Sequence, residues 1–177
     1  MGNKEVKMLW DTRYTEGLPS LTTPDPFFVE MYEKYILKKG AALDLAAGLG
    51  RHTNYLAERD WHVTAVDISS VAIGKLPVLQ NITAVVSDIE EYELKENAYD
   101  LVVLFYHFDR NLFPKIYKAL KQGGLLICKL AVSYKQSVEP LQREEFLSLV
   151  PEYSTIFHQE RPVRDRGVVE YLGRKNS

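Results

Sequence analysis

The sequence predicts an α/β protein built on a doubly wound, mostly parallel seven-stranded sheet that closes with a C-terminal antiparallel hairpin. Five short apolar runs rich in Val, Ile and Leu lack polar alternation, which is typical of strands buried on both faces of a parallel sheet. Helix-like stretches lie between these runs, so we expect right-handed crossovers with helices on both faces. Two more strand-like runs near the C-terminus are separated by too few residues for a crossover and must therefore pair antiparallel.

The first predicted element is a helix within "TPDPFFVEMYEKYILKKG", with Asp25 as its N-cap and Pro26 at its first position. The five predicted parallel strands are AALDLAA (41–47), HVTAVDI (62–68), ITAVVSD (82–88), YDLVVLF (99–105) and GLLICKLAV (124–132). A helix is expected directly after Gly50. Another is expected within "NLFPKIYKALKQGG", where Gly123-Gly124 would end it.

The last fifty residues depart from this alternation. "PLQREEFLSLV" predicts one more helix, and "YSTIFHQE" and "VVEYLGRK" predict the two strands of the hairpin. The loop "RPVRDR" between them carries Arg161, Arg164 and Arg166, which only Asp165 would offset. If the first hairpin strand runs parallel to the five strands before it, this loop lies at the carboxyl edge of the sheet. There it would either bind an anionic substrate or form a solvated turn.

Composition limits the class of protein. The chain has 177 residues, 46% of them hydrophobic, which is enough for one substantial core. A formal net charge of −2 argues against a dedicated nucleic-acid binder. No apolar run reaches the roughly 20 residues that span a bilayer, and the N-terminal residues lack a signal core. We therefore expect a cytoplasmic protein with no nucleic-acid partner and no membrane partner.

Cysteine and histidine usage gives no sign of metal or thiol chemistry. The lone Cys128 lies inside an apolar run and is expected to be a buried strand residue rather than a nucleophile. The four histidines and this cysteine show no zinc-ligand spacing, so the sequence predicts no metal site.

A glycine turn follows the first predicted strand, at the sheet edge where open parallel sheets bind ligands. In "DLAAGLG" (44–50), Gly48 and Gly50 let the backbone approach a ligand closely, and the next helix offers free N–H groups. The dinucleotide fingerprint requires Gly or Ala at position 53, where Thr53 stands, and the phosphate-loop pattern lacks its lysine. A turn with a purely structural role remains an alternative.

Three aspartates at the ends of successive predicted strands point to a nucleoside cofactor. Asp67 ends the second strand and could accept hydrogen bonds from the vicinal hydroxyls of a ribose. Asp44 puts a carboxylate beside the glycine turn, where it would repel a pyrophosphate but fit a cofactor with a cationic amine and a sulfonium. Asp88 follows the third strand and could accept a hydrogen bond from the exocyclic amine of an adenine.

The motifs carry a resemblance to a known family. The turn from Asp44 to Gly50, "AVDIS", "SDIEEYEL" and "YDLVVLFYHFDRNLFPKIYKALKQGGLLI" resemble, in order, the motifs of class I S-adenosylmethionine-dependent methyltransferases. "WDTRYTEG" and "GLGRH" are similar to the small tellurite-resistance and thiopurine-like branches. Ala46 replaces the commoner first glycine of the turn. The resemblance implies the Rossmann-like methyltransferase fold.

The resemblance also implies a domain organisation and a set of cofactor residues. A single methyltransferase domain over 1–177 would comprise an N-terminal helical cover (1–39), a cofactor-binding core (40–132) and a C-terminal helix and hairpin (133–177). The implied cofactor-binding residues are Arg13, Asp44, Ala46, Gly48, Gly50, Arg51, Asp67, Ile68, Asp88, Ile89 and Phe105. Among them Asp67 would hold the ribose, Asp88 the adenine amine, Asp44 the amino group, and Arg13 and Arg51 the carboxylate.

The activity implied is transfer of a methyl group from S-adenosylmethionine to a small-molecule acceptor, with S-adenosylhomocysteine as the product. The acceptor would be an anion or a thiol or chalcogen compound. Methyl transfer is an in-line displacement that needs positioning in a dry site and no covalent catalyst. Candidates on the substrate side are Tyr106, His107, Arg161, Arg164 and Arg166.

Two other functions compete with this one. A non-catalytic S-adenosylmethionine-binding subunit could activate or scaffold another methyltransferase. A nicotinamide-dependent oxidoreductase is disfavoured by Thr53, by Asp44 and by the terminal hairpin. The expected assembly is a monomer or a homodimer.

Overall fold

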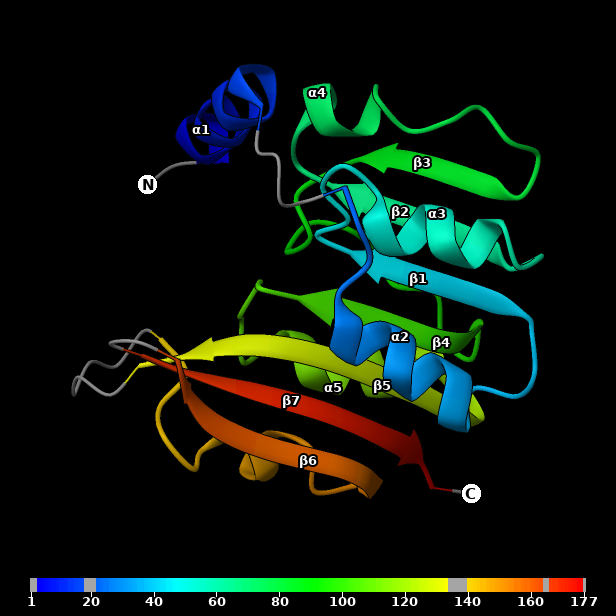
Figure 1. Ribbon diagram of the computed structural model, residues 1–177, viewed down its shortest axis with the longest axis vertical. Helices are drawn as coiled ribbons and strands as arrows, with labels where there is room; N and C mark the ends of the chain where they lie inside the picture. The colour runs from blue at the N-terminus through cyan, green and yellow to red at the C-terminus, as the bar shows by residue number, and fades with distance from the viewer. Residues whose placement is uncertain (1–2, 18–21, 134–139, 164–165, 177) are drawn as a thin grey trace. The chain divides into compact units, whose positions relative to one another are not determined.

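The computed structural model describes residues 3–17, 22–133, 140–163 and 166–176. The strands of these segments follow the order β3-β2-β1-β4-β5-β7-β6 in a seven-stranded sheet, so the predicted fold class is confirmed (Figure 1). Contacts divide the chain into two units, residues 1–93 and 94–177, which are described in turn.

The first unit alternates helices with three parallel strands. Its elements in chain order are α1 (Asn3–Glu16), α2 (Pro26–Tyr35), β1 (Ala41–Leu45), α3 (Arg51–Ala57), β2 (His62–Asp67), α4 (Ser70–Ile73) and β3 (Ile82–Val86). The register places Leu45 opposite Val66 and Asp67 opposite Val86, so the strands end at about the same level. The residues that follow β1, β2 and β3 therefore meet at one edge.

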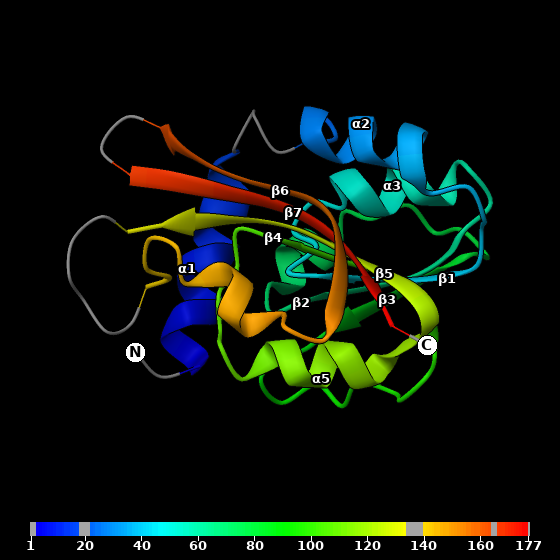
Figure 2. The same ribbon diagram turned by 90° about the horizontal axis from the view of Figure 1, so that it is seen from below.

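The second unit contains the hairpin. Its elements in chain order are β4 (Tyr99–Phe105), α5 (Leu112–Ala119), β5 (Leu120–Val132), the 3-10 helix η2 (Phe146–Leu149), β6 (Tyr153–Val163) and β7 (Arg166–Lys175). β5 is parallel to β4 and antiparallel to β7, which in turn is antiparallel to β6. Figure 2 shows β6 and β7 side by side. The predicted hairpin is therefore confirmed, and β6 runs in the direction of β4 and β5.

Helix α2 begins as its sequence predicts. Asp25 has an extended backbone, and its Oδ1 accepts the N–H of Phe27 at 3.0 Å, with Pro26 at the start of the helix. The backbone N–H of Asp25 also donates to Nε2 of His52 on α3 at 3.3 Å, so the cap connects the two helices. The helix buries Phe28 fully against this histidine, with ring centroids 4.5 Å apart.

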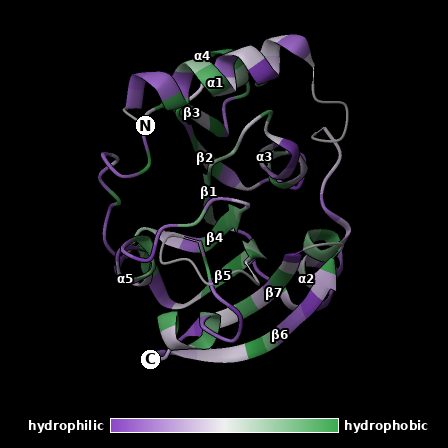
Figure 3. Cartoon of the chain, turned by 90° about the vertical axis from the view of Figure 1, so that its left-hand side faces the viewer, coloured by the Kyte–Doolittle hydropathy of each residue, from purple (hydrophilic) through white to green (hydrophobic). Residues whose placement is uncertain are grey.

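Strand burial matches the apolar runs except in β3. The interior residues of β1, β2, β4 and β5 are almost all buried, and hydrophobic residues gather on the strands (Figure 3). In β3, by contrast, Thr83, Ala84 and Val86 are exposed, so the expectation of burial on both faces is wrong for this strand. The physical reason is its place at the end of the strand order, where it has a single neighbouring strand.

The helix after β4 ends earlier than its glycines predict. α5 stops at Ala119 and β5 begins at Leu120, which pairs with Tyr99 and whose carbonyl accepts Nζ of Lys175 at 2.7 Å. Gly123, with φ of 73°, instead lies inside β5, where the pairing with β4 shifts register. A left-handed glycine therefore supports a bulge in the strand rather than the end of the helix.

The segment 140–150 is not the α-helix that its sequence predicts. It forms turns and the short helix η2, and Glu144 takes a left-handed φ of 62° that interrupts helical geometry. Glu145 accepts the backbone N–H of Gln142 at 2.8 Å and pairs with Arg110 at 2.6 Å. These tertiary contacts outweigh the helical preference of the sequence. None of the described helices is long and apolar enough to cross a membrane.

Candidate functional site

The turn from β1 into α3 is built from left-handed residues. Ala46, Gly48 and Gly50 have φ values of 56°, 54° and 75°, and the N–H of Gly50 donates to the carbonyl of Ala47 at 2.9 Å. Ala46 is strained in this region because it carries a Cβ, whereas the glycines are not. In the family that the sequence resembles a glycine is commoner at position 46, and the positive φ gives the physical reason.

Side chains of the protein itself lie against both glycines. A Cβ on Gly48 would stand 2.7 Å from the hydroxyl oxygen of Tyr14, and a Cβ on Gly50 would collide with Leu76. The sequence indicated that something bulky approaches this backbone. In the structure Tyr14 of α1 and Leu76 occupy those positions, so a Cβ at either glycine would require one of these side chains to move.

Asp67 is fixed from two sides at the end of β2. Its Oδ2 accepts the N–H of Gly48, and its Oδ1 accepts the N–H of Ser69, each at 2.8 Å. The residue is 6% exposed. A carboxylate has about four acceptor sites on its two oxygens, so the group that binds these two N–H groups could also accept hydrogen bonds from a vicinal diol.

Asp44 is a buried carboxyl at the end of β1. It is 2% exposed, and its Oδ2 accepts the hydroxyl of Thr53 at 2.6 Å. Burial raises the pKa of Asp44 from 3.8 to about 7, against the lowering effects of Thr53 and Arg51, while the charge of Asp67 adds to the rise. Thr53, which excluded the dinucleotide fingerprint, is therefore the hydrogen-bond partner of this carboxyl.

The two arginines expected near the cofactor carboxylate differ in position. Arg51 is the first residue of α3, and its charge acts on Asp44 and on the hydroxyl of Tyr14. Arg13 is exposed on α1, and its guanidinium carbon lies 4.9 Å from the centroid of the Trp10 ring. The charge of Arg51 therefore acts on both Asp44 and Tyr14, whereas Arg13, which is stacked on Trp10 of its own helix, acts on Tyr14.

The residues after β3 form a tight turn beside Asp67. Oδ1 of Asp88 accepts the N–H of Glu90 at 2.9 Å, and the N–H of Ser87 donates to the carbonyl of Asp67 at 3.0 Å. Ile89 is buried, and Ile68 is half-buried. The ends of β2 and β3 thus stay in register at the positions implied for ribose and adenine binding.

Tyr14 is part of this region, although its place here was not predicted from the sequence. It is 5% exposed, and burial together with the charge of Asp67 raises the pKa of its hydroxyl to about 12. A signal was available, because Tyr14 lies inside the "WDTRYTEG" motif. Without a predicted helix over 3–16, nothing in the sequence indicated which residue of that motif faces the turn.

Candidates for the substrate side lie in the second unit. Tyr106 is 52% exposed with a left-handed φ of 61°, and it follows Phe105, the residue implied for cofactor binding, which ends β4 and is buried. Its backbone N–H donates to the carbonyl of Lys129 at 2.8 Å. An exposed aromatic residue in a strained conformation is unusual and often marks a functional position. His107, which follows it, is half-buried.

The arginines of the hairpin do not share one environment. Arg161 lies within β6 and pairs with Glu170 of β7 at 3.1 Å, and Lys129 of β5 pairs with the same carboxylate at 3.0 Å. Burial would raise the pKa of Glu170, but the bonds from these two cations outweigh burial and lower it. Glu170 therefore offsets Arg161, a pairing that the sequence did not indicate. Arg166 is exposed at the start of β7, whereas Arg164, together with the aspartate that follows it, lies outside the described residues.

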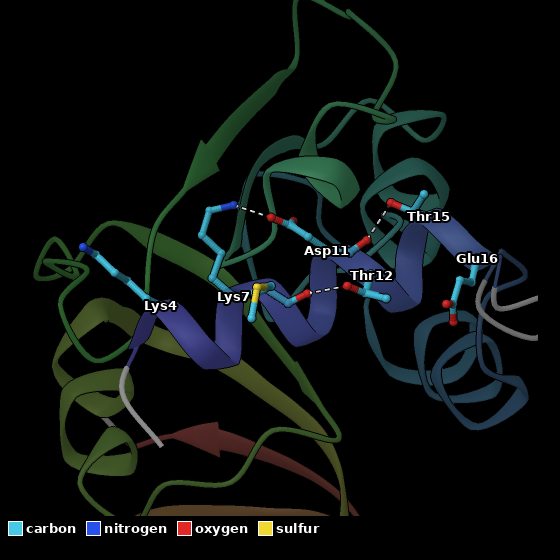
Figure 4. A pocket seen from close by; sticks show the side chains of 7 residues that line it. Lys4, Lys7, Asp11, Thr12, Thr15 and Glu16 are labelled. Atoms are coloured by element: carbon cyan, nitrogen blue, oxygen red, sulfur yellow. Dashed lines mark hydrogen bonds and ion pairs between the residues drawn. The ribbon is translucent and has the colours of Figure 1, made fainter.

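A hollow lies elsewhere on the described surface, along α1. It has a volume of about 420 Å³ and is lined by Lys4, Lys7, Met8, Asp11, Thr12, Thr15 and Glu16 (Figure 4). None of the residues implied for cofactor binding lines it. Within the described ranges, no group of three or more His, Cys, Asp or Glu side chains is placed to hold a metal ion.

Comparisons with known proteins agree with the resemblance. Residues 42–124 match the family model described as a methyltransferase domain. Phosphoethanolamine N-methyltransferase 1 from Triticum aestivum is 36% identical over 96 residues, which cover 46% of this chain and 19% of that enzyme. The chain thus spans less than a fifth of this relative.

Solved structures show the shared fold. TehB from Haemophilus influenzae has a TM-score of 0.75 at 19% identity, covering 86% of this chain and 63% of that one. The Burkholderia thailandensis 1,6-didemethyltoxoflavin-N1-methyltransferase with bound S-adenosylhomocysteine has a TM-score of 0.69 at 15% identity, covering 100% and 92%. The resemblance to class I S-adenosylmethionine-dependent methyltransferases is confirmed.

Replacing Asp44 with asparagine should change how stability depends on pH. A carboxyl whose pKa is higher in the folded protein stabilises the fold fully below pH 3.8, and this contribution is lost as pH rises toward about 7. The amide of Asp44→Asn would keep an acceptor for Thr53 without titrating. Urea unfolding across this range should show the variant gaining stability relative to the parent as pH rises; parallel curves would contradict the raised pKa.

Replacing Ala46 with glycine should increase the free energy of unfolding by about 1 kcal/mol, because it relieves a left-handed residue of its Cβ. Ala57→Gly in α3 is the matched control and should lower the free energy of unfolding by about 1 kcal/mol. Chemical denaturation measures both. Equal losses in the two variants would show that position 46 carries no strain.

Proposed function

We propose that this chain, which resembles the class I S-adenosylmethionine-dependent methyltransferases and shares their fold, transfers a methyl group from S-adenosylmethionine to a small-molecule acceptor. The observation that carries the proposal is the carboxylate of Asp67. The backbone N–H groups of Gly48 and Ser69 each donate to one of its oxygens at 2.8 Å, beside the glycine turn and at the carboxyl end of β2. This is where an open parallel sheet binds a nucleoside.

The electrostatics of the turn fit this cofactor. The Asp67 carboxylate, an acceptor of several hydrogen bonds, suits the two hydroxyls of a ribose. Asp44 has a pKa raised to about 7 by burial, so a cationic amino group nearby would favour its charged form. A pyrophosphate would bring negative charge, the same sign as the carboxylates, and would be repelled by them. These acceptor carboxyls therefore support an adenosyl cofactor with a cationic tail.

When bound, the cofactor would supply a methyl group activated by a sulfonium. Asp67 would orient the ribose, Asp88 and Ile89 would hold the adenine, and the turn through Gly48 would bind the amino-acid tail. None of these roles requires a covalent intermediate. What the protein contributes is orientation in a site from which water is excluded.

An anionic acceptor is the substrate class with most support. The Triticum aestivum relative is a phosphoethanolamine N-methyltransferase, so its acceptor carries a phosphate. In this chain Arg166 is exposed at the start of β7, where it could pair with such a group. Arg161 contributes less, because Glu170 already accepts from its guanidinium. Tyr106 and His107 are proposed as the other acceptor-side residues.

Replacing Asp67 with alanine should weaken binding of S-adenosylhomocysteine at least a hundredfold, because two hydrogen bonds to a charged acceptor are lost, each contributing about 1.5–3 kcal/mol. Isothermal titration calorimetry measures the affinity. Asp100→Ala, which removes a half-buried carboxylate paired with Lys121, is the control and should bind as the parent does.

The parent should also methylate a panel of phosphorylated amines and thiols. If it binds S-adenosylhomocysteine but transfers no methyl group to any of them, the non-catalytic subunit becomes the better account. If the parent does not bind the product at all, the proposal is wrong.

A further inference from the structure

Helix α1 is attached to the first unit mainly through polar contacts. Among the fourteen described residues of α1, only Tyr14 is buried. Its polar contacts include Asn3 to Glu91, Lys7 to Ser70, and the carbonyl of Tyr14, which accepts Nζ of Lys75 at 2.6 Å. A helix with so little buried apolar area detaches at low free-energy cost unless specific contacts hold it.

Asp11 makes the densest of these contacts. Its Oδ1 accepts the hydroxyl of Ser69 at 2.5 Å and the N–H of Val71 at 3.2 Å. Its Oδ2 accepts Nζ of Lys7 at 2.5 Å, a contact that Figure 4 shows. The bonds from Lys7 and Ser69 lower the pKa of Asp11 to about 2, so it is charged at neutral pH. One carboxylate on α1 therefore binds the segment that begins α4.

Ser69 connects Asp11 to Asp67. Its hydroxyl donates to Asp11 and accepts the N–H of Ala72 at 3.1 Å, which caps α4, while its own N–H donates to Oδ1 of Asp67 at 2.8 Å. The rotamer of Ser69 and the position of its backbone N–H are fixed together by these bonds. A change at Asp11 therefore reaches Asp67 through a single residue.

The same contact places Tyr14 over the glycine turn. Tyr14 lies three residues after Asp11, on the same side of α1. Its hydroxyl oxygen stands 2.7 Å from where a Cβ of Gly48 would be, and Gly48 is the other residue that donates to Asp67. Both donors that fix Asp67 are thus in contact with α1, one through Asp11 and one through Tyr14.

We propose that Asp11 is a positioning residue for the cofactor site: it holds α1 over the turn and, through Ser69, keeps the carboxylate of Asp67 oriented toward the ribose. This rests on the proposed function. A ligand bound to Asp67, which is 6% exposed, would lie under α1 and would leave when the helix detaches. Asp11 would therefore control the lifetime of the complex.

The experiment is stopped-flow measurement of S-adenosylhomocysteine binding to the parent and to Asp11→Ala. The dissociation rate should rise about tenfold or more, with the association rate unchanged or higher. Alanine favours the helix, so the effect would not come from unwinding α1. Thr12→Ala is the matched control, because its hydroxyl bonds to the carbonyl of Met8 within the helix, and it should keep the parent rates.

Two further variants separate positioning from general loss of stability. Ser69→Ala should also raise the dissociation rate. The ligand should dissociate from the double variant with Asp11→Ala no faster than from the faster of the two single variants, because both substitutions break the same hydrogen bond between Ser69 and Asp11. Lys75→Met removes the separate contact to Tyr14 from an exposed residue and should raise the rate less.

Multiplicative effects in the double variant, or parent-like dissociation in Asp11→Ala and Lys75→Met, would overturn the positioning role and leave the proposed function standing. Absence of any binding by the parent would overturn both. Hydrogen exchange at α1 should in addition be faster in Asp11→Ala than in Thr12→Ala, with the exchange of β1 and β2 unchanged.

Discussion

The candidate site depends on one constraint: the buried carboxylate of Asp67 must have its hydrogen bonds satisfied. Gly48 and Ser69, which donate to it, belong to the segments that follow β1 and β2 and lie nineteen and two residues from Asp67 in sequence, so the carboxylate joins two turns. An unpaired buried charge costs several kcal/mol. The position of the carboxylate and the conformations of the turns that supply its N–H donors therefore depend on each other. The left-handed backbone at Ala46, Gly48 and Gly50 is what brings the Gly48 N–H to this position.

The charge of the site follows from the same arrangement. Burial raises the pKa of Asp44, and the nearby charge of Asp67 adds to the rise. Two carboxyls in a desolvated turn create a preference for cationic groups and against phosphates. Thr53 supplies a hydroxyl at 2.6 Å to Asp44 and so makes this burial tolerable. Thr53 and Asp44, which distinguish the turn from a dinucleotide site, are thus also the residues that set its charge.

Local signals in the sequence predicted most of the fold. The strands, the Asp25 cap and the antiparallel hairpin depend on neighbouring residues or on loop length, and all three are confirmed. Features that depend on distant partners were missed. Asp11 meets Ser69 across 58 residues, and Arg110 holds Glu145 across 35, in a segment that its own sequence predicts as a helix. The roles assigned to Asp44, Asp67 and Asp88 stay predictions.

The most direct measurement is a crystal structure of the protein with S-adenosylhomocysteine. We expect the adenosyl group at the carboxyl ends of β2 and β3, with both ribose hydroxyls within hydrogen-bond distance of the Asp67 carboxylate and with the amino group on the side of Asp44. An adenosyl group bound elsewhere, or an Asp67 carboxylate that makes no contact with the ribose in the complex, would contradict this expectation.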